Sequence, residues 1–223
     1  MALRILTNAR RSMARERTAA VNALTALLRV VDLGIDARKP LTITQINTIA
    51  AWRERDEEFG VQTCRREATR LAKQILTLQE QMATNHTELE SLVQQVQPAL
   101  LEIYGIGPVL AAIILTAWSH TGRVRSEAAF AALAGTCPVP ASSGGTTRFR
   151  LNRGGDRQLN KAIYTIALVR MNRDQATRDY VAKRTNQGRT KKEIIRSLKR
   201  YITRQIFRQL NSVDAGSARA VVP

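Results

Sequence analysis

The chain has 223 residues and carries 35 Lys and Arg against 18 Asp and Glu, a formal net charge of +17 at pH 7. A charge of that size attracts polyanions, so nucleic acid is the first partner to expect and an anionic membrane surface the second. No apolar run reaches the roughly 18 residues of a membrane-spanning helix. Aromatic residues make up only 4% of the chain, which predicts a mainly helical protein with a core of Leu, Ile, Val and Ala.

Metal and disulfide chemistry find little support in the residue pattern. Cys64 and Cys137 lie far apart and outside any CxxC motif, which is typical of a reduced, intracellular protein. His86 and His120 each lack a neighbouring Cys or second His, so we expect no metal site in this chain.

The first predicted helix covers residues 2–31, where apolar residues recur at helical spacing up to Gly34 and Pro40. Because the chain begins inside this pattern, without a preceding cap, we expect a truncated or late-started reading frame. Thr42 is the predicted N-cap of a second helix, since Gln45 completes a capping box, and this helix should run to about Phe59. Its charged stretch at 53–58 mixes both signs, which favours an exposed helix face over a metal site.

Residues 61–96 show a heptad pattern that is typical of a coiled coil. Its apolar positions are interrupted by one polar residue, Asn85, of a type that fixes register. Such a seam can pair within the chain or between chains, and a coiled coil of this length favours a homo-oligomer. The seam positions are Cys64, Ala68, Leu71, Ile75, Leu78, Met82, Asn85, Leu89, Leu92 and Val96.

Pro98 ends the seam, and the stretch 98–118 then reads as helix, G-I-G-P turn and apolar helix. This order is similar to the helix-hairpin-helix element of DNA-binding proteins, in which backbone N–H groups at a helix N-terminus meet a phosphate. Gly105 and Gly107 would take that role. The alternative is a turn that only joins two helices.

Ser126 is the predicted N-cap of a helix over 127–134, which closes at Gly135. The stretch 136–161 is the least helix-like part of the chain. It contains two Gly pairs and two adjacent serines, Ser142 and Ser143, and its basic residues are Arg148, Arg150, Arg153, Arg157 and Lys161. Guanidinium groups clamp phosphate and a hydroxyl can attack phosphorus, which points to phosphoryl chemistry. A polar loop between two helices is the alternative.

A helix should start at Gly155 or Asp156, break near 186–188 and be followed by a last helix over 191–210. That last helix has a predicted buried stripe of Ile194, Ile195, Leu198, Tyr201, Ile202 and Ile206, with cations off the stripe at Arg196, Lys199, Arg200 and Arg204. Residues 144–210 hold 18 Lys and Arg against 4 Asp and Glu, an asymmetry typical of a phosphate-binding surface. We therefore predict a helical linker at 1–97, a compact nucleic-acid-binding domain at 98–210 and a fraying tail at 211–223.

Three motifs then occur in order: L-x-x-I-Y-G-I-G-P-x-x-A, F-A-A-L-A-G-T-C-P-V-P-A-S-S-G and L-N-R-G-G-D-R-Q-L-N-K-A-I-Y. Together they resemble the C-terminal transposase domain of the insertion sequence 110 family, over about residues 98–210, with the preceding coiled coil similar to that family's linker. The resemblance implies a DNA recombinase guided by a structured RNA, with a serine that becomes linked to DNA. The family's Ser-Gly step corresponds to Ser143, with Ser142 as the second candidate.

The resemblance also implies an N-terminal RNase-H-like domain whose four carboxylates hold Mg²⁺. No such set of carboxylates is apparent here, so we expect a form that is inactive alone and acts in the cytoplasm or on the nucleoid. A nucleic-acid-binding and assembly module without chemistry is the alternative function. A membrane-surface protein is disfavoured, because the basic helices carry buried stripes rather than exposed aromatics.

Overall fold

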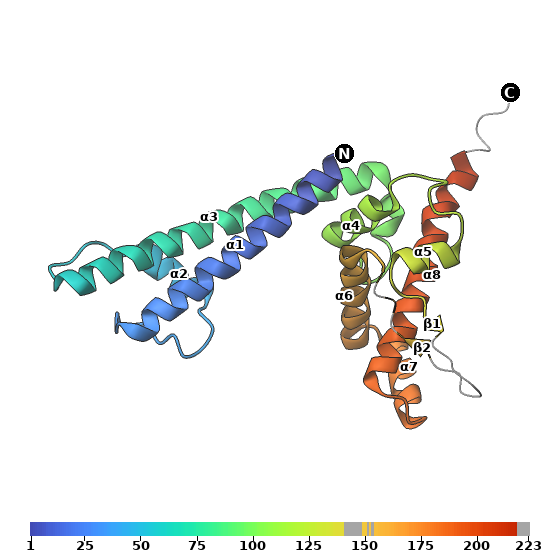
Figure 1. Ribbon diagram of the computed structural model, residues 1–223. Helices are drawn as coiled ribbons and strands as arrows, with labels where there is room; N and C mark the ends of the chain where they lie inside the picture. Colours follow the sequence, from blue (N-terminus) through green and yellow to red (C-terminus); the bar gives the residue numbers. More distant parts are fainter. Residues whose placement is uncertain (141–148, 151, 153, 218–223) are drawn as a thin grey trace. The chain divides into compact units, whose positions relative to one another are not determined.

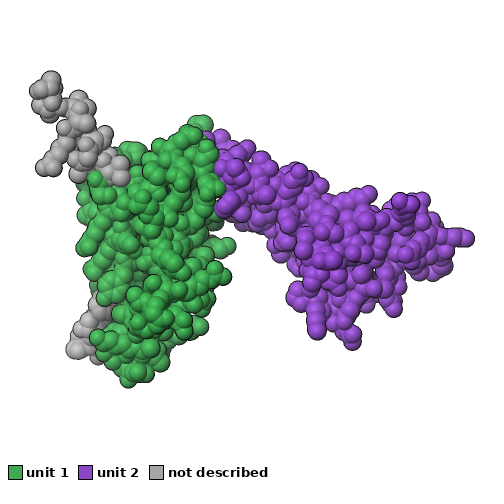
Figure 2. Space-filling model, turned by 180° about the vertical axis from the view of Figure 1, so that it is seen from behind, with its two compact units in different colours: residues 1, 3, 89–223 green, residues 2, 4–88 purple. Residues whose placement is uncertain are grey.

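The computed structural model describes residues 1–140, 149–150, 152 and 154–217, and it is mainly helical, as predicted. Its described elements are α1 (Ala2–Val30), α2 (Ile43–Ala50), α3 (Phe59–Val96), a single 3-10 turn η1 (Pro98–Leu100), α4 (Pro108–Trp118), α5 (Glu127–Leu133), β1 (Val139–Pro140), β2 (Phe149–Arg150), α6 (Arg157–Arg173), α7 (Gln175–Asn186) and α8 (Lys191–Ser217). Two compact units divide the chain: unit 2 contains Arg4–Glu88 and unit 1 contains Leu89–Pro223 (Figure 2). No helix in the described part of the chain is both long and apolar enough to cross a membrane.

Unit 2 is built on α1 and α3, which run antiparallel beside each other with α2 packed against them (Figure 1). Leu24 of α1, Ile49 of α2 and Ile75 of α3 are fully buried in one shared core. The predicted capping box of α2 is present, with the Thr42 hydroxyl accepting from the backbone of Gln45 and the Gln45 side chain accepting from the backbone of Thr42.

The heptad seam of α3 is used within this chain. Ala68, Leu71, Ile75, Leu78 and Asn85 are all buried. The Asn85 amide donates to the Leu6 carbonyl oxygen at 3.1 Å, and Arg10 of α1 donates to the Met82 carbonyl oxygen at 2.8 Å. Pairing between chains along this seam would therefore require α1 to leave it. Homo-oligomer formation through the seam stays a prediction.

The predicted seam is wrong at its C-terminal end, where Val96 is 57% exposed and Val93 is buried instead. A straight helix with 3.6 residues per turn drifts by about 20° per heptad from a 3.5-residue repeat. Over a helix as long as α3 this drift carries the buried stripe to a neighbouring position.

The predicted extension of the second helix to Phe59 is also wrong, since α2 ends at Ala50. Residues 53–58 offer no apolar side chain that could continue the buried face, and Glu57 instead reaches forward to Arg65 of α3 at 2.6 Å. The Arg65 guanidinium also lies 4.9 Å from the ring centroid of Trp52, so this segment is held by side chains rather than by helical hydrogen bonds.

Unit 1 is assembled around α8, which packs against α5, α6, α7 and η1. Trp118 of α4, Phe130 of α5 and Phe207 of α8 form an aromatic cluster with ring centroids 5.7–6.0 Å apart. The predicted stripe of α8 is buried at Ile194, Leu198, Ile202 and Ile206, with Ile195 partly buried. Tyr201 was wrongly placed in that stripe: it is 55% exposed, and its ring packs edge-on against Tyr180 of α7.

Three boundaries in unit 1 differ from the prediction. The helix expected before the G-I-G-P turn is only the 3-10 turn η1, because Pro98 and the following turns leave no room for a helical ladder. The stretch 156–186 is two helices, since Asp174 ends α6 and its carboxylate caps α7 by accepting from Thr177. The predicted tail begins too early, because α8 continues to Ser217.

Candidate nucleic-acid interface

A basic cleft of about 350 Å³ lies in unit 1 between the segment that follows α5, strand β2 and one face of α8. Five of the predicted phosphate-contacting cations line it: Arg150, Arg196, Lys199, Arg200 and Arg204. Thr136 also lines the cleft, and its hydroxyl oxygen lies 3.0 Å from the hydroxyl oxygen of the fully buried Thr203. We call this the α8 cleft.

Strands β1 and β2 lie at the edge of the α8 cleft and pair antiparallel, with Pro140 opposite Phe149. The chain therefore leaves this strand pair at Pro140 and returns to it at Phe149. The predicted nucleophiles Ser142 and Ser143, together with Arg148 and Arg153, lie outside the described residues.

The wall beside the cleft is made by two glycines whose backbones touch. A Cβ on Gly155 would lie 2.5 Å from the Gly135 nitrogen and 2.7 Å from the Leu133 carbonyl oxygen. Gly135 has a φ of +62°, which allows the chain to turn sharply after α5. The Asp156 nitrogen donates to the Leu133 carbonyl oxygen at 2.7 Å, so the start of α6 is fixed to the end of α5.

Asn160 of α6 connects this wall to α8. Its amide nitrogen donates to the carbonyl oxygens of Ala134 at 2.6 Å and Gly135 at 3.2 Å. Its amide oxygen accepts from the Lys199 ammonium at 2.7 Å. Burial lowers the pKa of Lys199 from its ordinary value, because the charged form loses contact with water.

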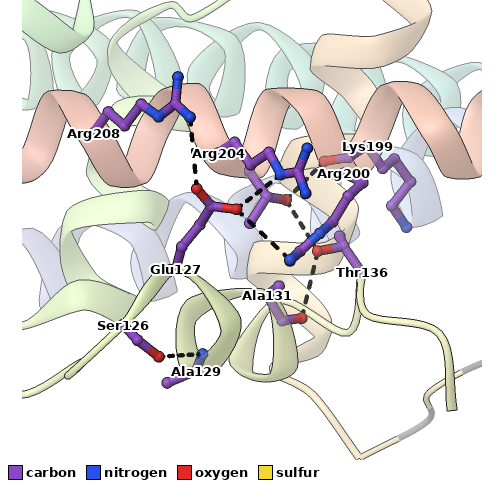
Figure 3. A network of polar contacts seen from close by, with 10 residues as sticks. Ser126, Glu127, Ala129, Ala131, Thr136, Lys199, Arg200, Arg204 and Arg208 are labelled. Atoms are coloured by element: carbon purple, nitrogen blue, oxygen red, sulfur yellow. Dashed lines mark hydrogen bonds and ion pairs between the residues drawn. The ribbon is translucent and has the colours of Figure 1, made fainter.

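Three arginines on one face of α8 share a single carboxylate, that of Glu127 at the start of α5 (Figure 3). The Glu127 Oε1 atom lies 2.8 Å from Arg204 Nε and 3.7 Å from Arg200 Nη2, and Oε2 lies 4.0 Å from Arg208 Nη2. One Arg200 nitrogen, Nη1, is buried and has no hydrogen-bond partner among the described residues. A buried donor without an acceptor is unfavourable, so a ligand oxygen in the cleft would stabilise it.

A second cleft, of about 370 Å³, is adjacent to the first, with which it shares Gly135 and Asn152, and it is also lined by Gly155. We call it the α6 cleft, because the predicted cations Arg157 and Lys161 line it together with Tyr164, all from α6. Of the five cations and two serines predicted for the stretch 136–161, the structure thus places one cation in the α8 cleft and two in the α6 cleft, and the other four residues lie outside the described residues.

The two glycines of the G-I-G-P turn line neither cleft. Gly107 is the N-cap residue of α4. Gly105 has a φ of +85°, and a Cβ there would lie 3.4 Å from Ile166 of α6. The Arg170 guanidinium donates to the Tyr104 carbonyl oxygen at 2.9 Å, which holds this turn against α6. These contacts account for Gly105 by packing, and the helix-hairpin-helix interpretation stays a prediction.

Sequence reasoning missed the residues that organise the clefts, namely Glu127, Asn152, Asn160 and Tyr164. Glu127 is only one acidic residue in the first turn of a predicted helix, and the two asparagines make contacts 15 to 39 residues away in sequence. Their signal in the sequence is weak, because only the folded chain brings α5, α6 and α8 together. No group of three or more His, Cys, Asp or Glu in the described part of the chain is arranged to hold a metal ion, so no described side chains fit the Mg²⁺ that the resemblance implies.

Comparison with known proteins relates this region to mobile genetic elements. Residues 97–182, which include α4, α5 and α6, match the family described as Transposase IS116/IS110/IS902 family. The chain is 28% identical over 143 residues to the insertion element IS110 uncharacterized 43.6 kDa protein of Streptomyces coelicolor, covering 63% of this chain and 35% of that protein. It is likewise 28% identical over 145 residues to the insertion element IS900 uncharacterized 42 kDa protein of Mycobacterium paratuberculosis, covering 63% of this chain and 36% of that protein.

The matches thus span about a third of the length of each relative. Both clefts lie in unit 1, and the matched segment contributes to the walls of each. The basic clefts of this protein are therefore built in large part from a segment that matches the IS116/IS110/IS902 transposase family.

Proposed function

We propose that this protein takes part in DNA transposition, with the α8 cleft holding the phosphate backbone of DNA and Ser143 attacking it. The observation that carries the proposal is the α8 cleft itself. Five cations line it, and one of them has a buried nitrogen without a hydrogen-bond partner among the described residues. The cleft lies in a unit that includes the segment matching a transposase family. Phosphate oxygens are the acceptors that such a set of Arg and Lys side chains prefers.

The proposed chemistry exchanges one phosphate ester for another. The Ser143 Oγ atom forms a bond to phosphorus, the bond from phosphorus to one strand oxygen breaks, and the serine proton ends on that departing oxygen. A serine hydroxyl is a weak nucleophile until it is activated, and cations near the phosphate stabilise the charge that develops. Arg150 and Arg200 are the described residues best placed for that role, since both line the cleft beside the strand pair that brackets residues 141–148.

Partners follow from the family resemblance. We expect DNA and a structured guide RNA as ligands and the cytoplasm or nucleoid as the place of action. The Mg²⁺ of the family is assigned to no described residue of this chain, and no step above is routed through it. Because the curated relatives are longer than this chain, the activity of a whole transposase is part of the proposal.

Binding is tested by the salt dependence of the affinity for duplex DNA. Each phosphate contact contributes a slope of about 0.9 in log K against log salt, so Arg150→Gln with Arg196→Gln should flatten the slope by roughly 2. Arg173→Gln with Arg178→Gln removes two exposed cations that line neither cleft and is the matched control. An equal effect of both double variants would remove the α8 cleft from the binding surface.

Chemistry is tested by covalent adduct formation with the remaining family segments, guide RNA and Mg²⁺ supplied in trans. Ser143→Ala should abolish the adduct and leave DNA binding within a few-fold, because a hydroxyl contributes little to backbone binding but supplies the ester oxygen. Ser142→Ala should retain the adduct. If neither variant lowers the adduct, the serine assignment is wrong and the chain is a nucleic-acid-binding and assembly module.

A further inference from the structure

We propose that the α6 cleft takes an unpaired nucleotide, with its base stacked on Tyr164 and its phosphate on Arg157 and Lys161. This inference rests on the proposed function, which it extends from duplex DNA to a substrate with an unpaired base beside the duplex. It starts from an aromatic ring that the fold leaves in a basic cleft.

Arg157, Lys161 and Tyr164 stand four and three residues apart, so they form one stripe along the exposed face of α6. The opposite face carries Leu159, Ala162, Ile163 and Ile166, all buried. With a rise of 1.5 Å per residue, Tyr164 lies roughly 4.5 Å along the helix axis from Lys161 and roughly 10 Å from Arg157. The spacing of the two cations and the ring along α6 is thus comparable to the size of one nucleotide.

The two asparagines that line the α6 cleft already make hydrogen bonds within the protein. Asn160 is held by the end of α5 and by Lys199, and Asn152 donates to the Ala132 carbonyl oxygen and accepts from the Gly154 nitrogen. No ion pair joins Arg157 or Lys161 to a carboxylate within the described residues. These two cations are therefore available to a ligand, whereas Arg200 and Arg204 of α8 share Glu127.

Tyr164 is 41% exposed in a cleft of about 370 Å³. That volume lies in the range of small-ligand sites, roughly 300–1,000 Å³. An aromatic ring beside cations is the arrangement that binds single-stranded nucleic acid, because any base offers a face for stacking and the cations take its phosphate. A paired base is stacked inside the duplex and cannot reach such a ring, which makes the site selective for unpaired nucleotides.

The position of the α6 cleft next to the α8 cleft suits a ligand that is partly duplex and partly unpaired. It shares Gly135 and Asn152 with the α8 cleft, so the two clefts are adjacent. A duplex with its backbone in the α8 cleft would then have a neighbouring unpaired nucleotide within reach of Tyr164. Strand exchange requires such a junction between paired and unpaired DNA.

The experiment compares a blunt DNA duplex with the same duplex bearing a short single-stranded extension, both labelled for fluorescence anisotropy at one salt concentration. The unchanged protein should prefer the extended duplex. Tyr164→Ala should lose about 5-fold or more of that preference, the low end for one base–aromatic stack, while its affinity for blunt duplex and its melting temperature stay the same. Tyr164→Trp should retain the preference, and Tyr104→Ala, which removes an exposed tyrosine outside both clefts, should leave it intact.

An unchanged preference in Tyr164→Ala, or an equal loss on both duplexes, would overturn the inference. The absence of any preference for the extended duplex in the unchanged protein would also overturn the inference. If the unchanged protein still bound blunt duplex in a salt-dependent way, the proposed function would stand. Failure to bind either DNA would overturn both.

Discussion

Replacing Glu127 with Gln removes the one carboxylate shared by three arginines of α8 and keeps the size of the side chain. The Glu127 side chain is 28% exposed, and the arginines are 26% to 76% exposed, so the ion pairs are partly screened by water. Partly exposed pairs contribute about 0.2–1 kcal/mol, and a carboxylate in the first turn of a helix about 0.3–1 kcal/mol. Glu127→Gln should therefore lower the free energy of unfolding by about 0.5–2 kcal/mol.

The affinity for DNA should change in the opposite direction. Two unit charges 4 Å apart in water interact by about 1 kcal/mol, and the energy falls inversely with distance. A phosphate on the far side of Arg200 or Arg204, roughly twice as far from Glu127, therefore meets a repulsion of about 0.5 kcal/mol. Without that repulsion at one or two phosphates, the affinity for duplex DNA should rise by about 2- to 5-fold at low salt.

Urea denaturation measures the first effect, and anisotropy titrations of labelled duplex at several salt concentrations measure the second. The gain should shrink as salt rises, because it is electrostatic. Glu193→Gln is the matched control, since Glu193 likewise lies in the first turn of a helix, α8, but pairs with an arginine, Arg189, that lines neither cleft. Weaker or unchanged binding by Glu127→Gln would refute competition and would mean that Glu127 holds the arginines in their binding positions.

Three further predictions concern the fold. Gly155→Ala should lower the free energy of unfolding in urea by about 1–3 kcal/mol, because its methyl group would meet the Gly135 backbone. Gly154→Ala, whose Cβ would make only an ordinary contact with Asn152 at 3.5 Å, should stay within about 0.5 kcal/mol; equal effects would contradict the backbone contact. Asn85→Ala should destabilise unit 2 by about 1–3 kcal/mol, since it breaks a buried bond to the Leu6 carbonyl, and an unchanged urea midpoint would show that this bond contributes nothing. Leu71→Asp with Leu78→Asp should lower the helical circular dichroism and leave the mass by light scattering unchanged, because both side chains pack within the chain; a fall in mass would mean that the seam joins two chains.

Local sequence signals predicted most of the helices, because each signal acts within a few residues. The Thr42 capping box, the Ser126 cap and the break near 186–188 all lie where the sequence predicted them, and the helix expected to start at Gly155 or Asp156 begins at Arg157 with Asp156 as its cap. Errors arose where a contact distant in sequence overrode the local pattern. Glu57 pairs with Arg65, and α2 does not continue to it. Asp174 lies between α6 and α7, where its carboxylate caps the start of α7 by accepting from the backbone of Thr177.

The candidate site was predictable in composition and unpredictable in arrangement. A net excess of cations after Gly144 pointed to phosphate binding, and five of those cations do line one cleft. Two other predicted cations, Arg157 and Lys161, line the second cleft instead. This division depends on the contact of Gly155 with Gly135, two residues that are 20 positions apart and have no side chain that a sequence pattern could reveal. The role of Tyr164 could not be predicted for a related reason. A single aromatic residue on a helix face does not indicate a binding site until the residues that form the rest of the cleft are known.

The same glycine contact bears on the chemistry proposed above. Pro140 and Phe149 pair with each other across strands β1 and β2. Beyond Arg150, Asn152 is tied by hydrogen bonds to Ala132 and Cys137, and Gly155 abuts Gly135. The strand pair is therefore anchored to the same wall beside the α8 cleft. Holding reactants in place supplies part of an enzyme's rate enhancement before any chemical activation, so the proposed chemistry would depend on this anchoring. Disturbing the wall should for that reason impair the proposed chemistry more than DNA binding, since Arg200 and Arg204 pair with Glu127, which is not part of the wall.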